Sequence, residues 1–226
     1  MQKCLYKGVC PNLSTNANNI GIKYALENGA DYVYLLNQDA WLLPDTLEKL
    51  IDISLLHPDY GIISPLQMQA NLEHFDRDFL NGSLRTNMQV LEDLIMQKQQ
   101  EVFPLQTVMA AHWLITRSCL EKVGLFSPSF PHYGEDDNYT NRANYWGFKV
   151  GVALNCMAVH DRESREATAE KTVYMSYISA IKNLSNIYEA KSHPLMASSL
   201  DMLRSFLKYG RCKQYFSLAF RLFSNG

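Results

Sequence analysis

The segment Asp31–Asp39 constrains the fold more than any other part of the chain, and its sequence is DYVYLLNQD. The residues at its centre are all aromatic or aliphatic, and turn-forming or polar residues bound them on both sides. Such a short apolar run predicts a strand that is buried on both faces, as the strands of parallel sheets are. The run ends abruptly at Asn37 and Asp39, and open α/β sheets bind ligands at the carboxyl ends of their strands. We therefore expect this segment to deliver polar side chains to a ligand-binding edge.

Asn37 and Asp39 stand two positions apart, and both side chains carry oxygen atoms that can bind a cation. Hard cations such as Mg²⁺ and Mn²⁺ prefer oxygen ligands, so the pair suits a divalent cation that bridges a diphosphate. The alternative is a polar strand end that caps the following helix, and the segment taken alone favours it. Three segments further along the chain bear on this choice.

Length and composition indicate one domain with an appendage. A chain of 226 residues with 47% hydrophobic content can bury a substantial core. Its formal net charge of -2 argues against a protein that coats nucleic acid. The five cysteines show no CxxC spacing, which fits a reducing cytoplasm better than a disulfide framework. We expect neither a signal peptide nor a membrane-spanning segment, since residues 1–13 lack a long apolar core and no apolar run approaches about 20 residues.

The order of the predicted elements indicates an α/β fold. We expect helices over residues 14–26 and 44–57, and a strand over Tyr60–Leu66 that Pro65 ends. Together with the strand in Asp31–Asp39 they form a strand–helix–strand unit, the rhythm of a mainly parallel sheet flanked by helices.

The rest of the chain continues this alternation less regularly. Residues 67–104 are polar, and we interpret them as a variable insert over the sheet edge with one helix near residues 88–99. We predict strands over residues 108–116, 148–153 and 157–160, and helices over residues 117–123 and 136–146. We assign residues 1–190 to one α/β domain and residues 191–226 to a helical tail.

A second polar cluster begins at Tyr133 and reads YGEDDNYTNR. Its three consecutive carboxylates, Glu135, Asp136 and Asp137, open a predicted helix, where the helix dipole stabilises negative charge. A carboxylate at this position, directed into a cleft, can accept a proton from a hydroxyl nucleophile. The alternative is ordinary capping of the helix.

Two further positions are candidates for ligand contact. His160 ends the last predicted strand, although a single histidine at a strand end is more often structural than a ligand. Trp113 lies in the strand over residues 108–116, where it suits either stacking against a sugar or packing in the core, and core packing is the simpler interpretation.

Together, five segments resemble the family-2 glycosyltransferases, and in particular the bacterial rhamnosyltransferase-like enzymes of surface-polysaccharide assembly. The segments are Asn12–Lys23, Asn37–Asp39, Arg117–Phe126, Tyr133–Asp137 and the terminal His160. The resemblance covers about residues 12–188 and lies in the order and spacing of motifs that are each short. It implies a GT-A-like α/β fold, a nucleotide-diphosphate sugar as donor, and inversion at the anomeric carbon by direct displacement.

The resemblance implies a metal side and an acceptor side of the site. On the metal side, Asp39 matches the last Asp of the family's DxD-type motif, and Asn37 stands where the first Asp would contact the donor. His160 matches a histidine that helps to hold the metal or the diphosphate, and the cofactor would be Mg²⁺ or Mn²⁺.

On the acceptor side, Asp136 matches the catalytic base and Glu135 its neighbour toward the acceptor. Arg142 follows about two helical turns later, where the family has an arginine that faces the site. With Trp113, these residues complete the expected substrate contacts. The acceptor would be a glycan or a lipid-linked sugar.

The chain departs from the family pattern at its amino-terminal side. The family begins with a strand that ends in Asn and a second strand whose Asp binds the nucleotide base, and no similar sequence precedes Asn12. We therefore expect an amino-terminally truncated GT-A-like domain, lacking those nucleotide-binding strands, with an exposed sheet edge.

Three functions compete at this point. The leading hypothesis is a glycosyltransferase, the second is an inactive remnant that binds a partner or a membrane, and the third is another metal-dependent hydrolase or nucleotidyltransferase. No Walker loop, GxSxG or HExxH sequence is present, which counts against unrelated kinases and hydrolases.

The tail favours contact with a membrane surface. Residues 202–226 combine basic and aromatic side chains and include no acidic residue. This composition is typical of an interfacial segment, so we expect peripheral attachment at the inner face of the cell membrane. The alternative is that the aromatic residues pack on the domain.

Overall fold

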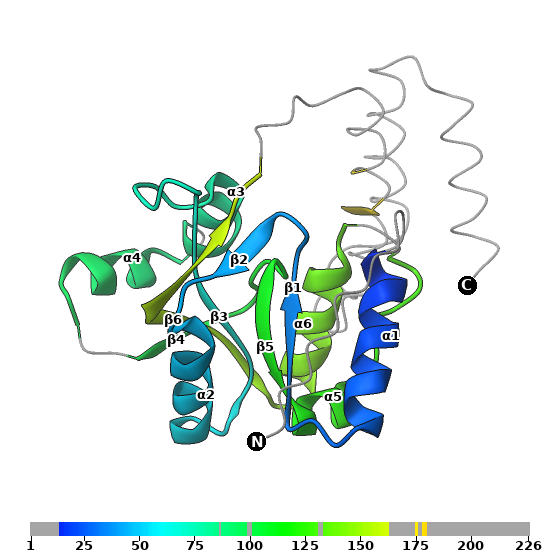
Figure 1. Cartoon of the computed structure of the whole chain (residues 1–226). Helices are drawn as coiled ribbons and strands as arrows, with labels where there is room; N and C mark the ends of the chain where they lie inside the picture. Colours follow the sequence, from blue (N-terminus) through cyan, green and yellow to red (C-terminus); the bar gives the residue numbers. More distant parts are fainter. Residues whose placement is uncertain are drawn as a thin grey trace, which may run out of the picture.

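The computed structural model describes residues 14–85, 87–98, 101–130 and 133–162, together with residues 175, 178 and 179. Figure 1 shows a twisted sheet with helices on both sides. The predicted boundary near residue 190, the tail and the segment before residue 14 lie outside the described residues.

The described helices are α1 (Ser14–Glu27), α2 (Thr46–Leu56), α3 (Arg77–Phe79), α4 (Met88–Ile95), α5 (Arg117–Val123) and α6 (Glu135–Tyr145), with a π-helical turn, η1 (Leu80–Leu84), after α3. The strands are β1 (Tyr32–Leu36), β2 (Ala40–Leu42), β3 (Tyr60–Met68), β4 (Val102–Leu105), β5 (His112–Thr116) and β6 (Lys149–His160).

The six strands belong to one sheet with the order β1-β5-β3-β6-β2, and β4 also pairs with β6. The α/β class with flanking helices is confirmed, but the expectation of a mainly parallel sheet needs correction. Only β3 and β6 pair in parallel, whereas the β1·β5, β3·β5, β2·β6 and β4·β6 ladders are antiparallel. A strand that is buried on both faces has an apolar sequence whether its neighbours run parallel or antiparallel to it. Its composition therefore does not reveal the direction of the neighbouring strands.

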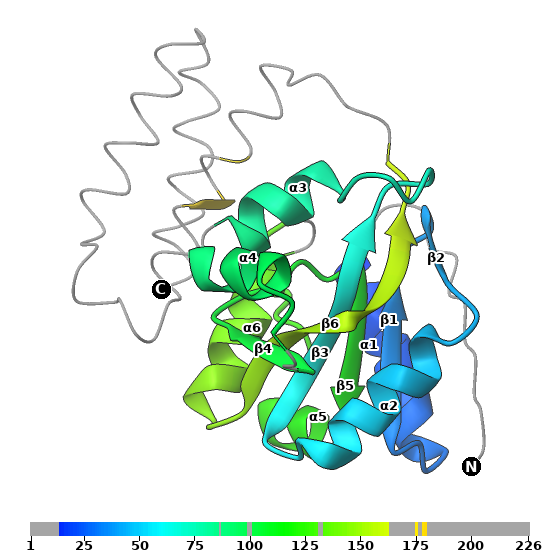
Figure 2. The same ribbon diagram turned by 90° about the vertical axis from the view of Figure 1, so that its left-hand side faces the viewer.

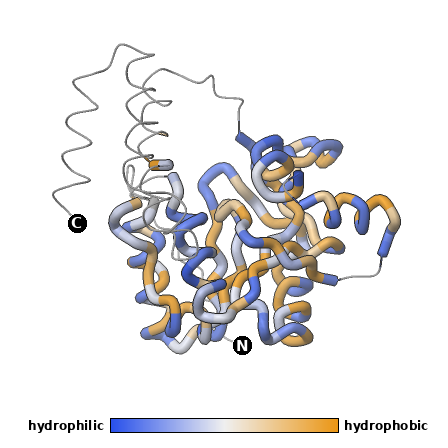
Figure 3. The backbone as a smooth tube through the Cα atoms, turned by 180° about the vertical axis from the view of Figure 1, so that it is seen from behind, coloured by the Kyte–Doolittle hydropathy of each residue, from blue (hydrophilic) through white to orange (hydrophobic). Residues whose placement is uncertain are grey.

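Helices cover both faces of the sheet. One face packs against α1, α5 and α6, whose buried residues include Ile22, Leu120 and Tyr139. The opposite face packs against α2 through Leu50 and Ile53. Figure 2 shows α2 and α6 on opposite sides of the sheet, and in Figure 3 hydrophobic residues run along the strands in the middle of the molecule.

Strand β1 is buried on one face and partly buried on the other, rather than buried on both faces as predicted, and its side chains alternate between these two layers. Val33 and Leu35 join the core on the side of α1, and Tyr32 and Tyr34 pack against the core on the side of α2. Two apolar layers therefore hold the strand that precedes Asp39.

Strand β6 is continuous where two strands were predicted. Its register against β3 shifts between Pro65 and Leu66, whose partners are Ala153 and Met157. The predicted break is thus a bulge, with Asn155 exposed at its centre. Pro65 lies inside β3 at this irregularity and does not end the strand, since a proline is tolerated at a bulge.

Strands β2 and β4 were not predicted. Strand β2 has only three residues, and β4 lies in the segment that we interpreted as a polar insert. Both strands add antiparallel partners to β6, β4 along its first half and β2 at its carboxyl end, and the pairing with β2 organises the edge described below.

We predict that Gly151→Ala destabilises the fold by about 1–3 kcal/mol, because overpacking strains a close-packed core. An added Cβ at Gly151 would lie 2.8 Å from the backbone oxygen of Phe103 and 2.5 Å from a ring carbon of Tyr60. Urea unfolding of the variant measures the change. Gly82→Ala is the control, since its Cβ would meet only the Met109 sulfur at 3.9 Å, and equal midpoints for the two variants would contradict the prediction.

Candidate active site

Strands β1, β3 and β6 end at the same edge of the sheet, which is the upper edge in Figures 1 and 2. The short β2 turns back along β6 from this edge, with Ala40 opposite His160. The Asp161 N–H donates a hydrogen bond of 2.8 Å to the Asp39 carbonyl. This backbone register brings the Asp39 Oδ1 to 3.5 Å from the His160 Nε2. The structure therefore unites the two residues that the sequence placed on the metal side of the site.

The other ring nitrogen of His160 faces a residue that the sequence analysis missed. The Asp76 Oδ2 lies 3.6 Å from the His160 Nδ1, and both side chains are 3% exposed. Asp76 precedes α3 and caps it, since its Oδ1 accepts a hydrogen bond of 2.7 Å from the Phe79 N–H. The aspartate three positions before Phe79 is a helix-capping signal, but the segment was interpreted only as an insert.

Arg162 holds Asp76 in place. Its guanidinium donates two hydrogen bonds to the Asp76 carboxylate, at 3.0 and 3.2 Å, and forms an ion pair of 3.1 Å with Asp78. Bidentate arginine–carboxylate pairs are strong and geometrically specific. The segment before α3 is thereby tied to the residue two positions after the end of β6.

The charges of this cluster follow from burial and pairing. Burial alone would raise the pKa of Asp76, but the hydrogen bonds from Arg162 and the Phe79 N–H outweigh it and hold the pKa below its ordinary value. For His160, burial comes first and the Arg162 cation second, and together they lower the pKa of the imidazole although three carboxylates oppose them. Asp76 is thus ionised beside a neutral His160 at neutral pH.

His112 supports the same edge from within the sheet. Its Nε2 lies 2.8 Å from the Val159 carbonyl, which can only accept, so the proton lies on Nε2. Its Nδ1 then accepts a hydrogen bond of 2.9 Å from the Tyr34 hydroxyl. Burial, as the largest cause, lowers the pKa of His112 to about 4, and the ring is neutral and structural. Its ring stands almost perpendicular to that of His160, with 6.5 Å between centroids.

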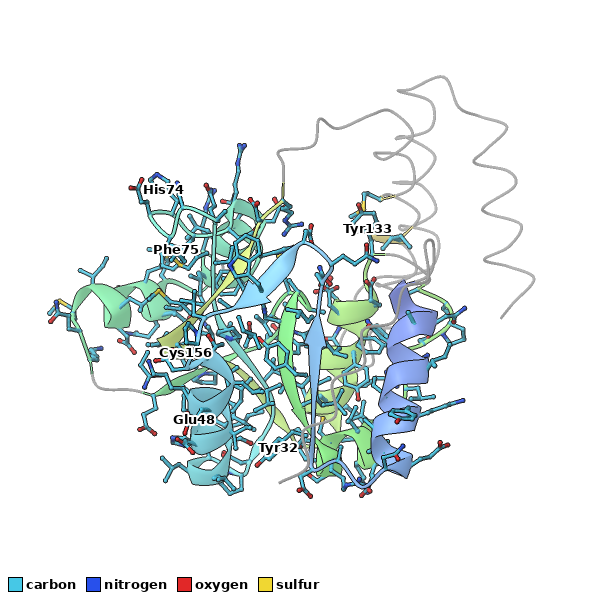
Figure 4. All side chains as sticks on the ribbon, in the orientation of Figure 1. Tyr32, Glu48, His74, Phe75, Tyr133 and Cys156 are labelled. Carbon is cyan, nitrogen blue, oxygen red and sulfur yellow. The ribbon has the colours of Figure 1, made fainter. Side chains whose placement is uncertain are left out.

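The acidic start of α6 reaches the same upper edge. Helix α6 ends shortly before β6 begins, so it runs opposite to β6 and begins near the carboxyl ends of the strands (Figure 1). Figure 4 shows Tyr133 just before α6 at the upper edge and Tyr32, which begins β1, at the lower edge. Tyr133 and Gly134 have φ angles of 65° and 81°, and this left-handed pair turns the chain into the helix.

The three carboxylates at the start of α6 have different surroundings. The Asp137 Oδ1 accepts a hydrogen bond of 2.9 Å from the Thr107 hydroxyl, which anchors the helix to the loop before β5. The Asp136 Oδ1 accepts a hydrogen bond of 2.9 Å from the Asp137 N–H. Glu135 is the first residue of the helix and is partly buried, as Asp136 is. The structure thus gives Asp137 an anchoring role that the sequence did not distinguish.

Two residues with predicted substrate contacts are structural instead. Trp113 is fully buried and stacks on Phe126 at 6.1 Å between ring centroids, so no sugar can reach it and core packing is correct. Arg142 donates hydrogen bonds to the carbonyls of Val123 and Leu125, at 3.0 and 2.8 Å. The prediction that Arg142 faces a ligand is wrong for this conformation. Its guanidinium instead donates to carbonyls at the end of α5 that have no hydrogen-bond donor within the helix.

Asn37 is exposed immediately after β1, and its backbone N–H donates to the Ala111 carbonyl at 3.1 Å. Among the described residues its side chain makes no hydrogen bond, and its predicted contact with a donor stays a prediction.

Two segments of the family resemblance meet through the helices. The Asn19 side chain of α1 both donates to and accepts from the backbone of Phe126, at 3.0 and 2.9 Å. Arg117 donates to the carbonyls of Leu26 and Ala30, at 3.2 and 2.8 Å, and so holds the end of α1 against β5. These parts of the motifs therefore build the helical layer that carries α6.

The metal ligands can be tested against this geometry. Within the described part of the chain, no three His, Cys, Asp or Glu side chains gather so as to hold a metal ion. Asp39 and His160 nevertheless offer an oxygen and a nitrogen 3.5 Å apart, a spacing that two ligands of one small cation adopt. The pair fits a cation whose remaining ligands come from a bound diphosphate and water.

Comparison with known proteins gives one sequence relative and a set of solved structures with a similar fold. The chain is 22% identical over 195 residues to the low-salt glycan biosynthesis hexosyltransferase Agl10 of Haloferax volcanii, across 84% of this chain and 63% of that protein. The mannosyltransferase PcManGT of Pyrobaculum calidifontis, solved with GDP-Man and Mn²⁺, aligns with a TM-score of 0.51 and 14% identity over 91% of this chain and 54% of that one. No model of a known protein family matches the chain.

These likenesses establish the fold, which is a GT-A-like α/β sheet with flanking helices. The chain spans less than two thirds of the length of either protein. Among the described helices, none is long and apolar enough to cross a membrane.

We predict that Tyr34→Phe lowers the free energy of unfolding by about 1–2 kcal/mol, because the buried His112 Nδ1 loses its hydrogen-bond donor. Chemical denaturation measures the loss. Tyr32→Phe is the matched control two positions earlier on the same strand face, and its hydroxyl makes no hydrogen bond among the described residues. A loss of equal size in both variants would contradict the role of the Tyr34–His112 bond.

Proposed function

We propose that this chain is a glycosyltransferase that moves a sugar from a nucleotide-diphosphate sugar to a hydroxyl acceptor. The observation that carries the proposal is the meeting of Asp39 and His160 at the edge where the acidic start of α6 also lies. The fold adds support, because the PcManGT structure that shares it contains GDP-Man and Mn²⁺. The hexosyltransferase relative supports the same class of reaction.

On the metal side, the Asp39 Oδ1 and the His160 Nε2 would hold Mg²⁺ or Mn²⁺. A divalent cation bound there supplies Lewis-acid stabilisation of the charge that develops on a departing diphosphate. The residues themselves suit this task, since the Asp39 side chain is 40% exposed and accessible to a cation, while that of His160 is 3% exposed.

On the acceptor side, Asp136 acts as the general base. An acceptor hydroxyl is a weak nucleophile near neutral pH, and a carboxylate within hydrogen-bond reach removes its proton as the new bond forms. The amino-terminal end of α6 favours the ionised form of this carboxylate. Direct attack opposite the departing diphosphate inverts the anomeric carbon, and Glu135 lies on the acceptor side of the base.

We further propose the class of sugar that is transferred and the class of acceptor that receives it. The motif resemblance supports a rhamnosyltransferase-like enzyme of surface-polysaccharide assembly, and the relative supports transfer of a hexose in glycan biosynthesis. A glycan or lipid-linked acceptor fits both. Attachment to the inner face of the cell membrane through residues 191–226 would bring the site to a lipid-linked acceptor.

We predict that Asp39→Asn weakens Mn²⁺-dependent binding of a nucleoside diphosphate at least about tenfold, because a carboxylate ligand is lost. Isothermal titration of UDP, GDP and dTDP, each with and without Mn²⁺, identifies the nucleotide and measures the change. Asp45→Asn is the control, as Asp45 is an exposed partner of Lys49 on α2. Binding that is equally tight in Asp39→Asn, or that occurs without Mn²⁺, would contradict this metal site.

We predict that Asp136→Asn lowers the transfer rate by roughly 10²–10⁴-fold, the usual contribution of a general base. Affinity for the donor should change less than about threefold, because the base acts in the chemical step. Asp137→Asn is the control next in sequence, since its amide oxygen can still accept from Thr107. Transfer that survives in Asp136→Asn, or that is lost equally in both variants, would exclude Asp136 as the base.

A further inference from the structure

We propose that Asp76 is a positioning residue that holds His160 as its Nδ1–H tautomer and so turns the Nε2 lone pair toward Asp39. The inference deepens the proposed function, because that lone pair is what a divalent cation would bind. Asp76 lies outside every segment that resembles the family, and it acts on a ligand of the cation rather than on the cation itself.

The ring of His160 is buried between two carboxylates. His160 is 3% exposed, and each of its two nitrogens faces one carboxylate oxygen, that of Asp39 at 3.5 Å and that of Asp76 at 3.6 Å. Among the residues that the structure describes, Nδ1 has no hydrogen-bond partner within ordinary bonding distance. A neutral imidazole carries one N–H and one lone pair. One carboxylate therefore faces a donor, and the other faces a lone pair.

The two carboxylates differ in their exposure to solvent. The Asp76 side chain is 3% exposed, whereas that of Asp39 is 40% exposed. A lone pair turned toward the buried charge of Asp76 would be repelled with little water to screen it. The charge of Asp39 is open to solvent or to a cation. The proton therefore belongs on Nδ1, and Nε2 is left as the ligand atom.

The Asp76 side chain is held by several hydrogen bonds. Its carboxylate accepts two hydrogen bonds from Arg162 and one from the Phe79 N–H, which fix both oxygens. A small closure of the 3.6 Å separation would create a charge-assisted hydrogen bond from Nδ1. In metal sites, such a carboxylate behind a histidine sets the tautomer and raises the basicity of the ligand nitrogen.

The neighbouring histidine supports the assignment by contrast. His112 carries its proton on Nε2, because the carbonyl of Val159 requires a donor there. The His112 ring lies beside the His160 ring but does not determine which nitrogen of His160 carries the proton. The two histidines at this edge thus have opposite tautomers, each set by the acceptor that faces it.

Nitrogen NMR of the chain labelled at histidine tests the proposal directly. At pH 8, where an imidazole is neutral, the ring shifts distinguish a protonated from an unprotonated nitrogen. His160→Gln assigns the His160 signals. We expect a protonated Nδ1 and an unprotonated Nε2 in the wild-type chain, and this measurement needs no variant at position 76.

Asp76→Asn supplies the second measurement. An amide can still cap α3, but its NH₂ group can donate to Nδ1, so we expect the proton of His160 to move to Nε2. Mn²⁺ affinity, measured by electron paramagnetic resonance without any nucleotide, should fall about 10–100-fold. Asp78→Asn is the matched control, since Asp78 pairs with Arg162 from an exposed position and does not contact His160. In Asp78→Asn, the tautomer of His160 and the affinity for Mn²⁺ should match those of the wild-type chain.

A wild-type His160 protonated on Nε2 would overturn the proposal, as would an unchanged tautomer in Asp76→Asn. If Asp76→Asn keeps the wild-type tautomer and Mn²⁺ affinity while the wild-type chain binds Mn²⁺ and a nucleotide, the proposed function stands and the role of Asp76 falls. If the tautomer moves as expected but the wild-type chain binds no Mn²⁺, either alone or together with a nucleoside diphosphate, the role of Asp76 stands and the metal site of the proposed function falls.

Discussion

The upper edge of the sheet depends on a buried imidazole that lies between two carboxylates at the end of β6. His160 is nearly inaccessible to solvent and has an aspartate oxygen within 3.6 Å of each ring nitrogen. Neither carboxylate is close to it in sequence. Asp39 arrives because β2 pairs with β6, and Asp76 arrives because Arg162 binds it across the edge. Removing Arg162 would leave the buried Asp76 carboxylate without its cationic partner, which is costly in a protein interior.

Three arginines hold elements of the fold together through the donors of their guanidinium groups, and of these Arg162 lies at the upper edge. Arg117 donates hydrogen bonds to carbonyls at the end of α1, and Arg142 donates to carbonyls at the end of α5. Arg162 donates to the Asp76 carboxylate before α3. The last carbonyls of a helix lack partners within the helix, and a planar guanidinium supplies several donors at fixed angles. The family-like sequence around Arg117 is therefore largely a scaffold, which places α6 and its acidic start.

The edge separates two kinds of negative charge. Asp39 is partly exposed beside a neutral histidine, an arrangement suited to a cation and the diphosphate that it would bind. Asp136 stands at the start of α6, where the helix dipole stabilises negative charge, and it is the proposed general base. A displacement reaction uses both, because charge leaves on one side of the sugar while a proton leaves on the other. This division of roles is what the proposed function requires of the fold.

Local sequence was sufficient wherever the signal lay within one element. The apolar run before Asn37 determined β1, and Thr116 and Gly124 determined the ends of α5 by capping its first turn and by adopting a positive φ at its end. The terminal position of His160 and the acidic start of α6 were also legible, since both are features of a single element. Only the tertiary structure decided the direction of β5, the bulge that joins the two halves of β6, and the burial of Trp113. It also decided which polar residues meet: Asp76 became part of the site and Arg142 did not. The physical reason is that hydrophobic periodicity and capping act over a few residues. Strand register, burial and charge pairing depend on partners as distant as Asp76 and Arg162, which no local pattern brings together.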